Sequence, residues 1–160
     1  MPTSRVLLLG DPRLYEKSTD IEGEDWMNVP QMVAQLDEVL QAFKARYGAF
    51  RGIAAPQLGI MKRLIYLNID RPIAIINPDI TYYSQEMFEL WDDCMCFPNL
   101  LVKVKRHQSC TIRYQNPKQE VETWSLEGDL SELIQHEYDH LEGILAIQRA
   151  VNPTAFKWRP

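Results

Sequence analysis

The stretch "LIQHEYDHLEG", residues 133–143, contains two of the three histidines of this 160-residue chain. His136 and His140 are four positions apart, and Glu137 directly follows the first of them. On a helix, side chains four positions apart project from the same face, so the two imidazoles can bind one metal ion. Glu137 can then reach a water at the open position of that ion and accept its proton. The pattern predicts metal-dependent hydrolysis and does not indicate the substrate.

A catalytic metal site of this kind needs a third protein ligand. Downstream of His140 the sequence offers none. Glu142 is too close along the chain, and Ala146 occupies the position where the metzincin proteases have their third histidine. The third ligand is therefore expected upstream.

The upstream candidates are the cysteines in "WDDCMCFP", residues 91–98, because a thiolate binds borderline and soft cations well. Cys94 and Cys96 are two positions apart and would share one face of a strand, so their spacing does not choose between them. His107, in "VKRHQS", is a further candidate, although a histidine in such a run is more typical of a strand surface.

The composition is typical of one globular domain over residues 1–160, with 46% hydrophobic and 24% charged residues. The formal net charge of −5 disfavours nucleic acid as a partner. Near the start only Val6–Leu9 form an apolar run, which is too short for a signal peptide, and no run is long enough for a membrane span. We therefore expect a soluble, cytoplasmic protein with reduced cysteines, among which Cys110 is expected to be buried.

The first strong structural pattern is an amphipathic helix over residues 28–48. Asn28 can cap its start, Pro30 suits its first turn, and Gly48 can end it. From residue 60 the pattern changes to short runs rich in β-branched and aromatic residues, separated by Pro, Asn and Asp. These runs predict antiparallel strands at 62–69, 74–83, 86–91, 100–107, 109–116 and 120–126.

A second helix is expected to start near Asp129 or Ser131 and to end at Gly143. A long early helix, a block of strands and a late helix together predict an α+β fold. We expect antiparallel β-sheets packed around the C-terminal metal-binding helix, with one long N-terminal helix.

Three motifs occur in a fixed order: "GIAAPQLG" at residues 52–59, a Cys-x-x-x-Pro at residues 94–98, and "QHEYDHLEG" at residues 135–143. Together with "GDPRL" at residues 10–14, they resemble the peptide deformylases. These are metalloenzymes that remove the N-formyl group from newly made proteins of bacterial type. The resemblance spans most of the chain.

The resemblance implies a set of metal ligands. The second motif of the family reads Glu-Gly-Cys-Leu-Ser, and its cysteine is the third ligand. In "DDCMC", residues 92–96, that position is Cys94, and Cys96 stands where the family has serine. Cys94, His136 and His140 are therefore expected to hold one divalent ion. The family implies Fe²⁺ as the native ion, with Zn²⁺, Ni²⁺ or Co²⁺ able to substitute.

The resemblance also implies the catalytic roles. Glu137 is expected to accept the proton of the attacking water and to pass it to the departing amine. The side-chain amide of Gln57 and the backbone N–H of Met95 are expected to donate to the developing oxyanion. The residues expected at the substrate are Arg51, Gly52, Ile53, Asp93 and Leu133. Gly52 would allow close approach of the peptide backbone.

The sequence departs from the family around the expected site. The departures are Phe50 and Arg51 for a glycine and an apolar residue, Asp92 and Asp93 for Glu-Gly, and Glu132 for a usually apolar or basic residue. We expect Asp92 to pair with Arg106, at the position of the basic partner in the family. We expect Arg51, Asp93 and Glu132 to neutralise one another, because an unpaired charge beside a dry pocket is costly.

The favoured hypothesis is a peptide deformylase acting on the formylated N-termini of nascent chains. The first alternative is a catalytically altered or inactive deformylase-like metal-binding protein that recognises peptide N-termini or another formylated amide. Another hydrolase of the His-Glu-x-x-His type, such as an endopeptidase, is the second alternative. Pro153 and Pro160 leave little room for the basic C-terminal helix that docks some deformylases on the ribosome. We therefore expect no stable ribosome docking, and a monomer or weak dimer.

Overall fold

The computed structural model of the protein describes residues 5–160, so the first four residues of the predicted domain lie outside the described range. The strands pair antiparallel in two sheets, one five-stranded in the order β1-β2-β3-β6-β7 and one three-stranded in the order β4-β5-β8. The helices are α1 (Val29–Tyr47) and α2 (Asp129–Leu141). The strands are β1 (Gly52–Ala54), β2 (Leu64–Asn68), β3 (Pro72–Tyr83), β4 (Met87–Asp92), β5 (Leu100–His107), β6 (Ser109–Gln115), β7 (Val121–Glu127) and β8 (Phe156–Trp158).

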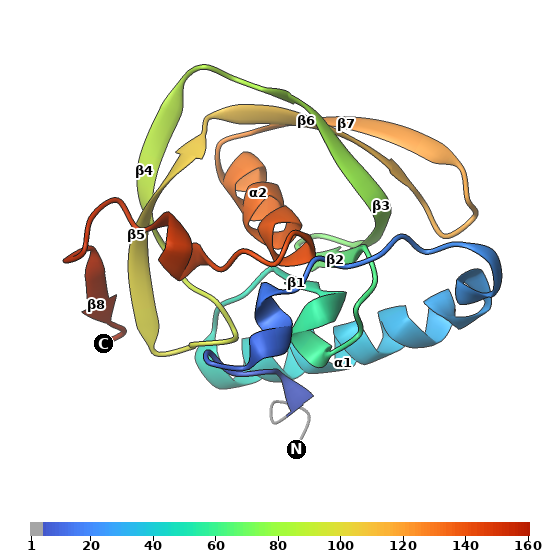
Figure 1. Cartoon of the computed structure of the whole chain (residues 1–160), viewed down its shortest axis with the longest axis horizontal. Helices are drawn as coiled ribbons and strands as arrows, with labels where there is room; N and C mark the ends of the chain where they lie inside the picture. The colour runs from blue at the N-terminus through green and yellow to red at the C-terminus, as the bar shows by residue number, and fades with distance from the viewer. Residues whose placement is uncertain (1–4) are drawn as a thin grey trace.

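The predicted α+β fold is confirmed. Figure 1 shows α2 in the middle of the molecule, with the strands arranged around it and α1 along one side. The helix α2 contacts β1, β2, β5, β6 and β7, and therefore touches both sheets. Each of the six predicted strands is present, within two residues of the expected bounds. The strands β1 and β8 were not predicted, because three residues are too few to show an alternating pattern.

The helix α1 packs one apolar face against the core. Leu36, Val39, Leu40 and Phe43 are buried at helical spacing. The helix ends where Gly48 adopts a left-handed conformation, and the Gly48 N–H donates to the Lys44 carbonyl at 2.9 Å. Asn28 holds the predicted N-cap position of α1, but the capping bond expected of it is absent. Its side chain makes no capping hydrogen bond, because Asn28 already belongs to a 3-10 helix (Gly23–Asn28) that leads directly into α1.

The helix α2 is buried along most of its length, although many of its residues are polar. Several of its polar side chains are satisfied by neighbouring elements, as is usual for buried polar groups. Gln135 accepts from the His107 N–H at 3.0 Å and donates to the His107 carbonyl at 2.9 Å. At the end of the helix, Arg63 donates to the Leu141 carbonyl at 3.0 Å. These contacts fix both the rotation and the position of the helix between the sheets.

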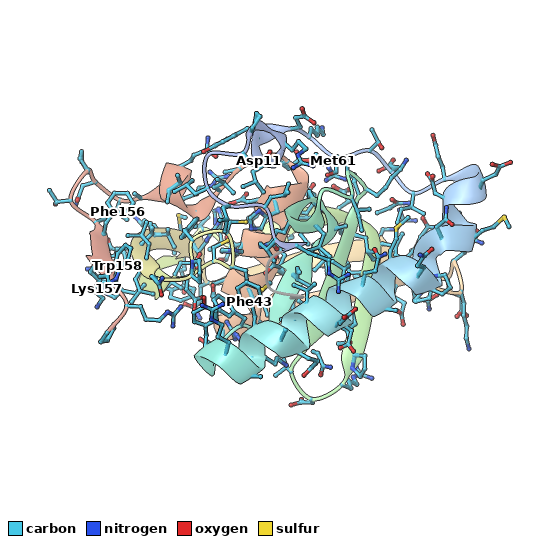
Figure 2. All side chains as sticks on the ribbon, turned by 90° about the horizontal axis from the view of Figure 1, so that it is seen from below. Asp11, Phe43, Met61, Phe156, Lys157 and Trp158 are labelled. Carbon is cyan, nitrogen blue, oxygen red and sulfur yellow. The ribbon has the colours of Figure 1, made fainter. Side chains whose placement is uncertain are left out.

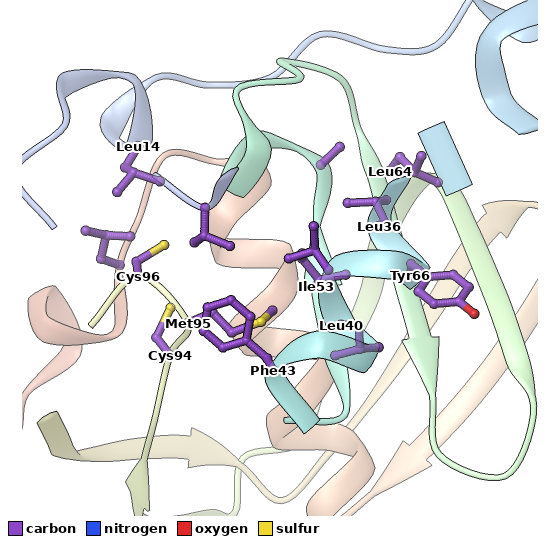
Figure 3. Close-up of a cluster of buried hydrophobic side chains, with 14 of the residues drawn as sticks. Leu14, Leu36, Leu40, Phe43, Ile53, Leu64, Tyr66, Cys94, Met95 and Cys96 are labelled. Atoms are coloured by element: carbon purple, nitrogen blue, oxygen red, sulfur yellow. The ribbon is translucent and has the colours of Figure 1, made fainter. Parts of the chain in front are cut away.

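Two buried clusters surround α2. One joins α1, β1 and β2 to the loop between β4 and β5, and Figure 3 shows Cys94, Met95 and Cys96 within it. The other lies between α2 and the five-stranded sheet and includes Cys110, whose predicted burial is confirmed. Within residues 5–160 the three cysteines are free thiols. Neither helix in that range has the length and apolar content needed to cross a bilayer.

Replacing Leu36 tests the contribution of α1 to the core. Leu36 is fully buried, so Leu36→Ala should lower the free energy of unfolding by roughly 3 kcal/mol through lost burial and a residual cavity. Gln31→Ala, at an exposed position of the same helix, should change it by less than about 0.5 kcal/mol. Urea unfolding followed by circular dichroism measures both, and equal effects would contradict the assigned face of α1.

Candidate metal centre

Three buried side chains from two parts of the chain form a compact donor cluster. The sulfur of Cys94 and a ring nitrogen of each of His136 and His140 all lie within 4.8 Å of one another. Cys94 follows β4 in the loop to β5, and both histidines project from α2. The Cys94 Sγ is 3.4 Å from the His140 Nε2. One soft sulfur and two imidazoles at this spacing are a donor set typical of a transition-metal site.

The orientation of His136 is fixed by a carboxylate. Its Nδ1 lies 2.8 Å from Asp92 Oδ2, which leaves Nε2 for a cation. Burial lowers the pKa of His136, but the Asp92 carboxylate raises it by more, to about 10. The environment of this ring therefore favours a positive charge. A bound cation would replace the proton on Nε2, since a ligating imidazole must be neutral.

The two other donors are uncharged without a cation. Burial lowers the pKa of His140 well below its ordinary value, which keeps this imidazole neutral and able to ligate. Burial raises the pKa of Cys94 well above its ordinary value. Ionising this thiol in such a place requires a nearby positive charge, and a ligated cation supplies one. The charges of the cluster thus fit a metal cofactor.

Glu137 lies beside the cluster with an unsatisfied oxygen. Within residues 5–160 its Oε1 is buried and has no hydrogen-bond partner. The pKa of Glu137 is raised to about 7, because burial and the nearby acidic groups outweigh the opposing effect of His136. A buried oxygen without a partner is rare and costly, so it indicates a position prepared for a water or a ligand.

Gly52 brings the backbone of β1 close to Glu137. A Cβ at this position would lie 3.4 Å from Glu137 Oε2 and only 2.6 Å from Cδ2 of the buried Leu67. Any side chain here would therefore displace Leu67 or crowd the carboxylate. The close approach of β1 to Leu67 and Glu137 therefore requires glycine at position 52.

Gln57 is held in a fixed orientation next to the sulfur donor. Its Oε1 accepts from the Ala54 N–H at 2.8 Å, so its Nε2 is turned toward the thiols, 3.8 Å from Cys94 Sγ and 3.6 Å from Cys96 Sγ. Cys96 is buried and outside the donor cluster. The geometry therefore favours Cys94 over Cys96 as the sulfur donor.

His107 lies outside the cluster as well. Its Nδ1 is 2.7 Å from the Ser84 carbonyl, and its ring lies beside that of Tyr83 with the ring centroids 4.6 Å apart. It serves the structure of the three-stranded sheet.

A cavity of about 510 Å³ opens beside the donor cluster. Of the eleven residues predicted for the site, nine line this cavity: Arg51, Gly52, Gln57, Asp93, Cys94, Met95, Leu133, His136 and Glu137. His140 does not line it. Ile53 does not either, because its side chain is fully buried in the core. The structure therefore brings the three sequence motifs together around one cavity.

Known proteins with similar sequences and structures agree with the site described above. The family described as "Polypeptide deformylase" matches residues 3–155. The chain belongs to the peptide deformylase family. It is 41% identical over 152 residues to a peptide deformylase of Natranaerobius thermophilus, with 94% of each chain covered. It is 32% identical over 146 residues to that of Thermotoga petrophila, covering 91% of this chain and 85% of the relative.

Solved structures of the family have the same fold. The peptide deformylase of Thermotoga maritima aligns with a TM-score of 0.84 and 30% identity, covering 92% of this chain and 97% of that one. The Synechococcus elongatus peptide deformylase in complex with actinonin aligns with a TM-score of 0.85 and 27% identity, covering 92% of this chain and 79% of that one.

The departures from the family motifs form ion pairs. The predicted pair of Asp92 and Arg106 is confirmed, with Arg106 Nη2 3.3 Å from Asp92 Oδ2. Burial raises the pKa of Asp92, but His136 and Arg106 lower it by more, so Asp92 is a carboxylate. Arg106 also binds Asp139 on α2 at 2.7 Å. Asp92 therefore serves a histidine and an arginine at once, and its bond to His136 was not predicted from the sequence.

The expected mutual neutralisation of three charges is only partly correct. Arg51 Nη2 does pair with Glu132 Oε1 at 2.5 Å. Asp93 instead binds Arg159 Nη2 at 2.6 Å. Arg159 was not predicted at the site, because it lies 65 positions from Cys94 and no motif includes it. Two ion pairs thus line the cavity of this deformylase.

The bond between Asp92 and His136 should control metal affinity. Asp92→Asn should weaken binding of Zn²⁺ about 10- to 100-fold, because the imidazole loses its anionic partner. Asp70→Asn, at an exposed turn, should leave the affinity unchanged. Competition with a chromophoric chelator measures both, and equal affinities would show that Asp92 does not support the site.

The buried Glu132 should make stability depend on pH. Burial raises its folded-state pKa to about 7 from an ordinary value of 4.5, and Arg51 only partly opposes this increase. The native state therefore holds this proton more tightly than the unfolded state, and the wild type loses the advantage as pH rises through 7. Glu132→Gln cannot titrate, so its stability relative to wild type should rise by roughly 2 kcal/mol between pH 5 and pH 8.

Glu24→Gln, at an exposed position, is the matched control and should show no such rise. Unfolding free energies in urea at several pH values provide the comparison. A difference of opposite slope would mean that pairing with Arg51 outweighs burial at this residue.

Proposed function

We propose that this chain removes the N-formyl group from formylmethionine at the start of new polypeptides, using one divalent metal ion. Membership of the peptide deformylase family supports this activity over most of the chain. The observation that carries it is the buried carboxylate of Glu137, whose Oε1 has no partner among residues 5–160, in a cavity beside a cluster of one thiol and two imidazoles.

Cys94, His136 and His140 would hold the ion. The buried thiol, the neutral His140 and the Asp92-bound His136 support this assignment. We propose Fe²⁺ as the native ion, with Zn²⁺, Ni²⁺ or Co²⁺ able to substitute, since a thiolate and two imidazoles accept all four. When bound, such an ion lowers the pKa of a water and polarises the carbonyl that is attacked.

Glu137 performs the proton transfers. Its carboxylate lines the cavity and accepts the proton of the attacking water as the oxygen adds to the formyl carbon. The C–N bond of the formamide then breaks, and the same proton passes from Glu137 to the departing amine. Formate and a free amino terminus result. A pKa raised toward neutrality suits a group that must both accept and release a proton.

Gln57 and Met95 supply hydrogen bonds to the oxyanion. The bond from the Ala54 N–H holds the Gln57 carbonyl oxygen and turns its NH₂ group toward the sulfur of Cys94, so this donor lies beside the metal ligand where the oxyanion would form. The Met95 side chain is buried in the core, so its backbone is the part that can meet a substrate. The N–H of Met95 forms no hydrogen bond within residues 5–160, which leaves it free to donate.

The remaining parts of the proposal concern the substrate and its surroundings. Arg51, Gly52, Asp93 and Leu133 line the cavity, which supports their predicted place at the substrate. For Ile53 only the backbone of β1, an edge strand of its sheet, is left to meet a peptide. We retain a single domain, a cytoplasmic location, a monomer or weak dimer, no nucleic-acid partner and no stable ribosome docking as predictions.

A second candidate function rests on the charged cavity. The pairs Arg51–Glu132 and Asp93–Arg159 make the cavity more polar than a formylmethionine side chain prefers. A deformylase-like metal-binding protein that recognises peptide ends or another formylated amide would have this property. Glu137 and Gln57 both line the cavity beside the donor cluster, which favours a hydrolase over a binding protein without turnover.

The first test is turnover of formyl-Met-Ala-Ser by protein purified without oxygen and loaded with Fe²⁺. Glu137→Ala should lower kcat by about 10²–10⁴-fold with metal retained, because proton transfer is lost. Cys94→Ala should lose both metal and turnover. Cys110→Ala removes a buried thiol outside the cluster and should keep both. Metal-loaded protein without turnover would contradict the proposed activity on this substrate.

A further inference from the structure

Arg159, which follows the C-terminal strand β8, forms part of the wall of the catalytic cavity. The strand β8 pairs with β5 so that Trp158 lies opposite Leu100, and the Arg159 N–H then donates to the Asn99 carbonyl at 2.8 Å. Figure 2 shows Phe156, Lys157 and Trp158 grouped at one end of the molecule. The next residue, Arg159, is among those that line the cavity. A segment distant in sequence from the motifs thus reaches the site.

The guanidinium of Arg159 is held in place by three contacts. Its Nε donates to the Pro98 carbonyl at 2.8 Å, and its Nη2 donates to Asp93 Oδ2 at 2.6 Å. Its central carbon lies 5.5 Å from the centre of the Phe50 ring. These contacts come from the loop between β4 and β5 and from the segment before β1, and only 21% of the side chain remains exposed. The group is therefore pre-organised before any ligand binds.

One nitrogen of this guanidinium is left for a ligand. Nη1 has no hydrogen-bond partner among residues 5–160, and it is not among the fully enclosed unsatisfied atoms. An arginine carries two N–H donors on this nitrogen. Because the side chain lines the cavity, an acceptor inside the cavity can use them.

The position of Arg159 indicates which part of a substrate it meets. Its partner Asp93 directly precedes Cys94, so Arg159 lies close to the donor cluster but outside it. A formyl group at the cluster leaves the peptide that follows to extend along the cavity. Asp93 already neutralises the guanidinium, which favours a neutral acceptor over a carboxylate. A peptide carbonyl oxygen is such an acceptor.

We propose that Arg159 binds a backbone carbonyl of the formylated peptide beyond its first residue, which makes this one residue after β8 part of the substrate site. This inference rests on the proposed deformylase activity. It makes Arg159 a binding residue that selects for peptide length, with no part in the proton transfers.

The test compares two substrates, formyl-Met-Ala-Ser and the shorter N-formylmethionine methylamide, which lacks carbonyls beyond the first residue. Arg159→Ala should raise KM for the tripeptide about tenfold, as expected for one charge-assisted hydrogen bond, and change kcat less than about twofold. KM for the methylamide should be unchanged. Lys157→Ala is the matched control, because Lys157 lies over Trp91 and does not line the cavity.

A purely structural role for Arg159 predicts a different result. If the arginine only braces the loop of Cys94, Arg159→Ala would lower kcat and metal content with both substrates alike, and this outcome would overturn the proposal. An unchanged KM for the tripeptide would overturn it as well. Failure of the wild type to hydrolyse either substrate would instead contradict the proposed function itself.

Asp93→Asn gives a second, independent test. Removing the neutralising carboxylate leaves Arg159 with a net positive charge. For the Asp93→Asn variant, the KM for formyl-Met-Ala with a free C-terminal carboxylate should then be severalfold lower than the KM for the same peptide as a C-terminal amide. The wild type should favour the C-terminal amide, because Asp93 neutralises its guanidinium. Equal KM values for the two forms in Asp93→Asn would contradict the placement of this guanidinium at the substrate.

Discussion

The buried carboxylate of Asp92 is the contact on which the rest of the site depends. It belongs to the last residue of β4, in the three-stranded sheet, and it meets His136 of α2 and Arg106 of β5. A lone carboxylate in such a place would be costly, so both partners are needed to keep it ionised. Because the partners lie on different elements, one charge fixes the helix relative to the sheet and the imidazole relative to the cavity.

On α2, the side chains of the metal site and the side chains that anchor the helix lie in two neighbouring rows. His136, His140 and Glu132 follow each other at intervals of four residues, and Gln135 and Asp139 follow on the adjacent row. Asp139 binds Arg106 and Arg149, and Gln135 binds the backbone of His107. Loss of Asp139 would leave the buried Arg106 with only one of its two carboxylate partners, which is more costly than the loss of a surface pair. The row of Gln135 and Asp139 thus holds the row that carries His136 and His140 in position.

The sequence predicts those features that are local or that repeat. The two histidines and Glu137 follow from helical spacing, and the six longer strands follow from their composition. The sulfur donor could be narrowed only to Cys94 or Cys96 by spacing, and the family resemblance was needed to choose. The bond between Asp92 and His136 joins positions 44 residues apart, so no local sequence pattern predicts it. Arg159 reaches the cavity through a strand of three residues, whose pairing depends on tertiary contacts alone.

The position of Cys94 has a mechanical consequence. This residue lies in a loop of the smaller sheet, whereas both histidines lie on the helix packed against the larger sheet. An ion held by all three would act as a reversible cross-link between the halves of the molecule. Its ligation energy exists only while the halves are docked, so that energy adds to the stability of the native state. Metal binding at this site would then stabilise the fold in addition to supporting the reaction.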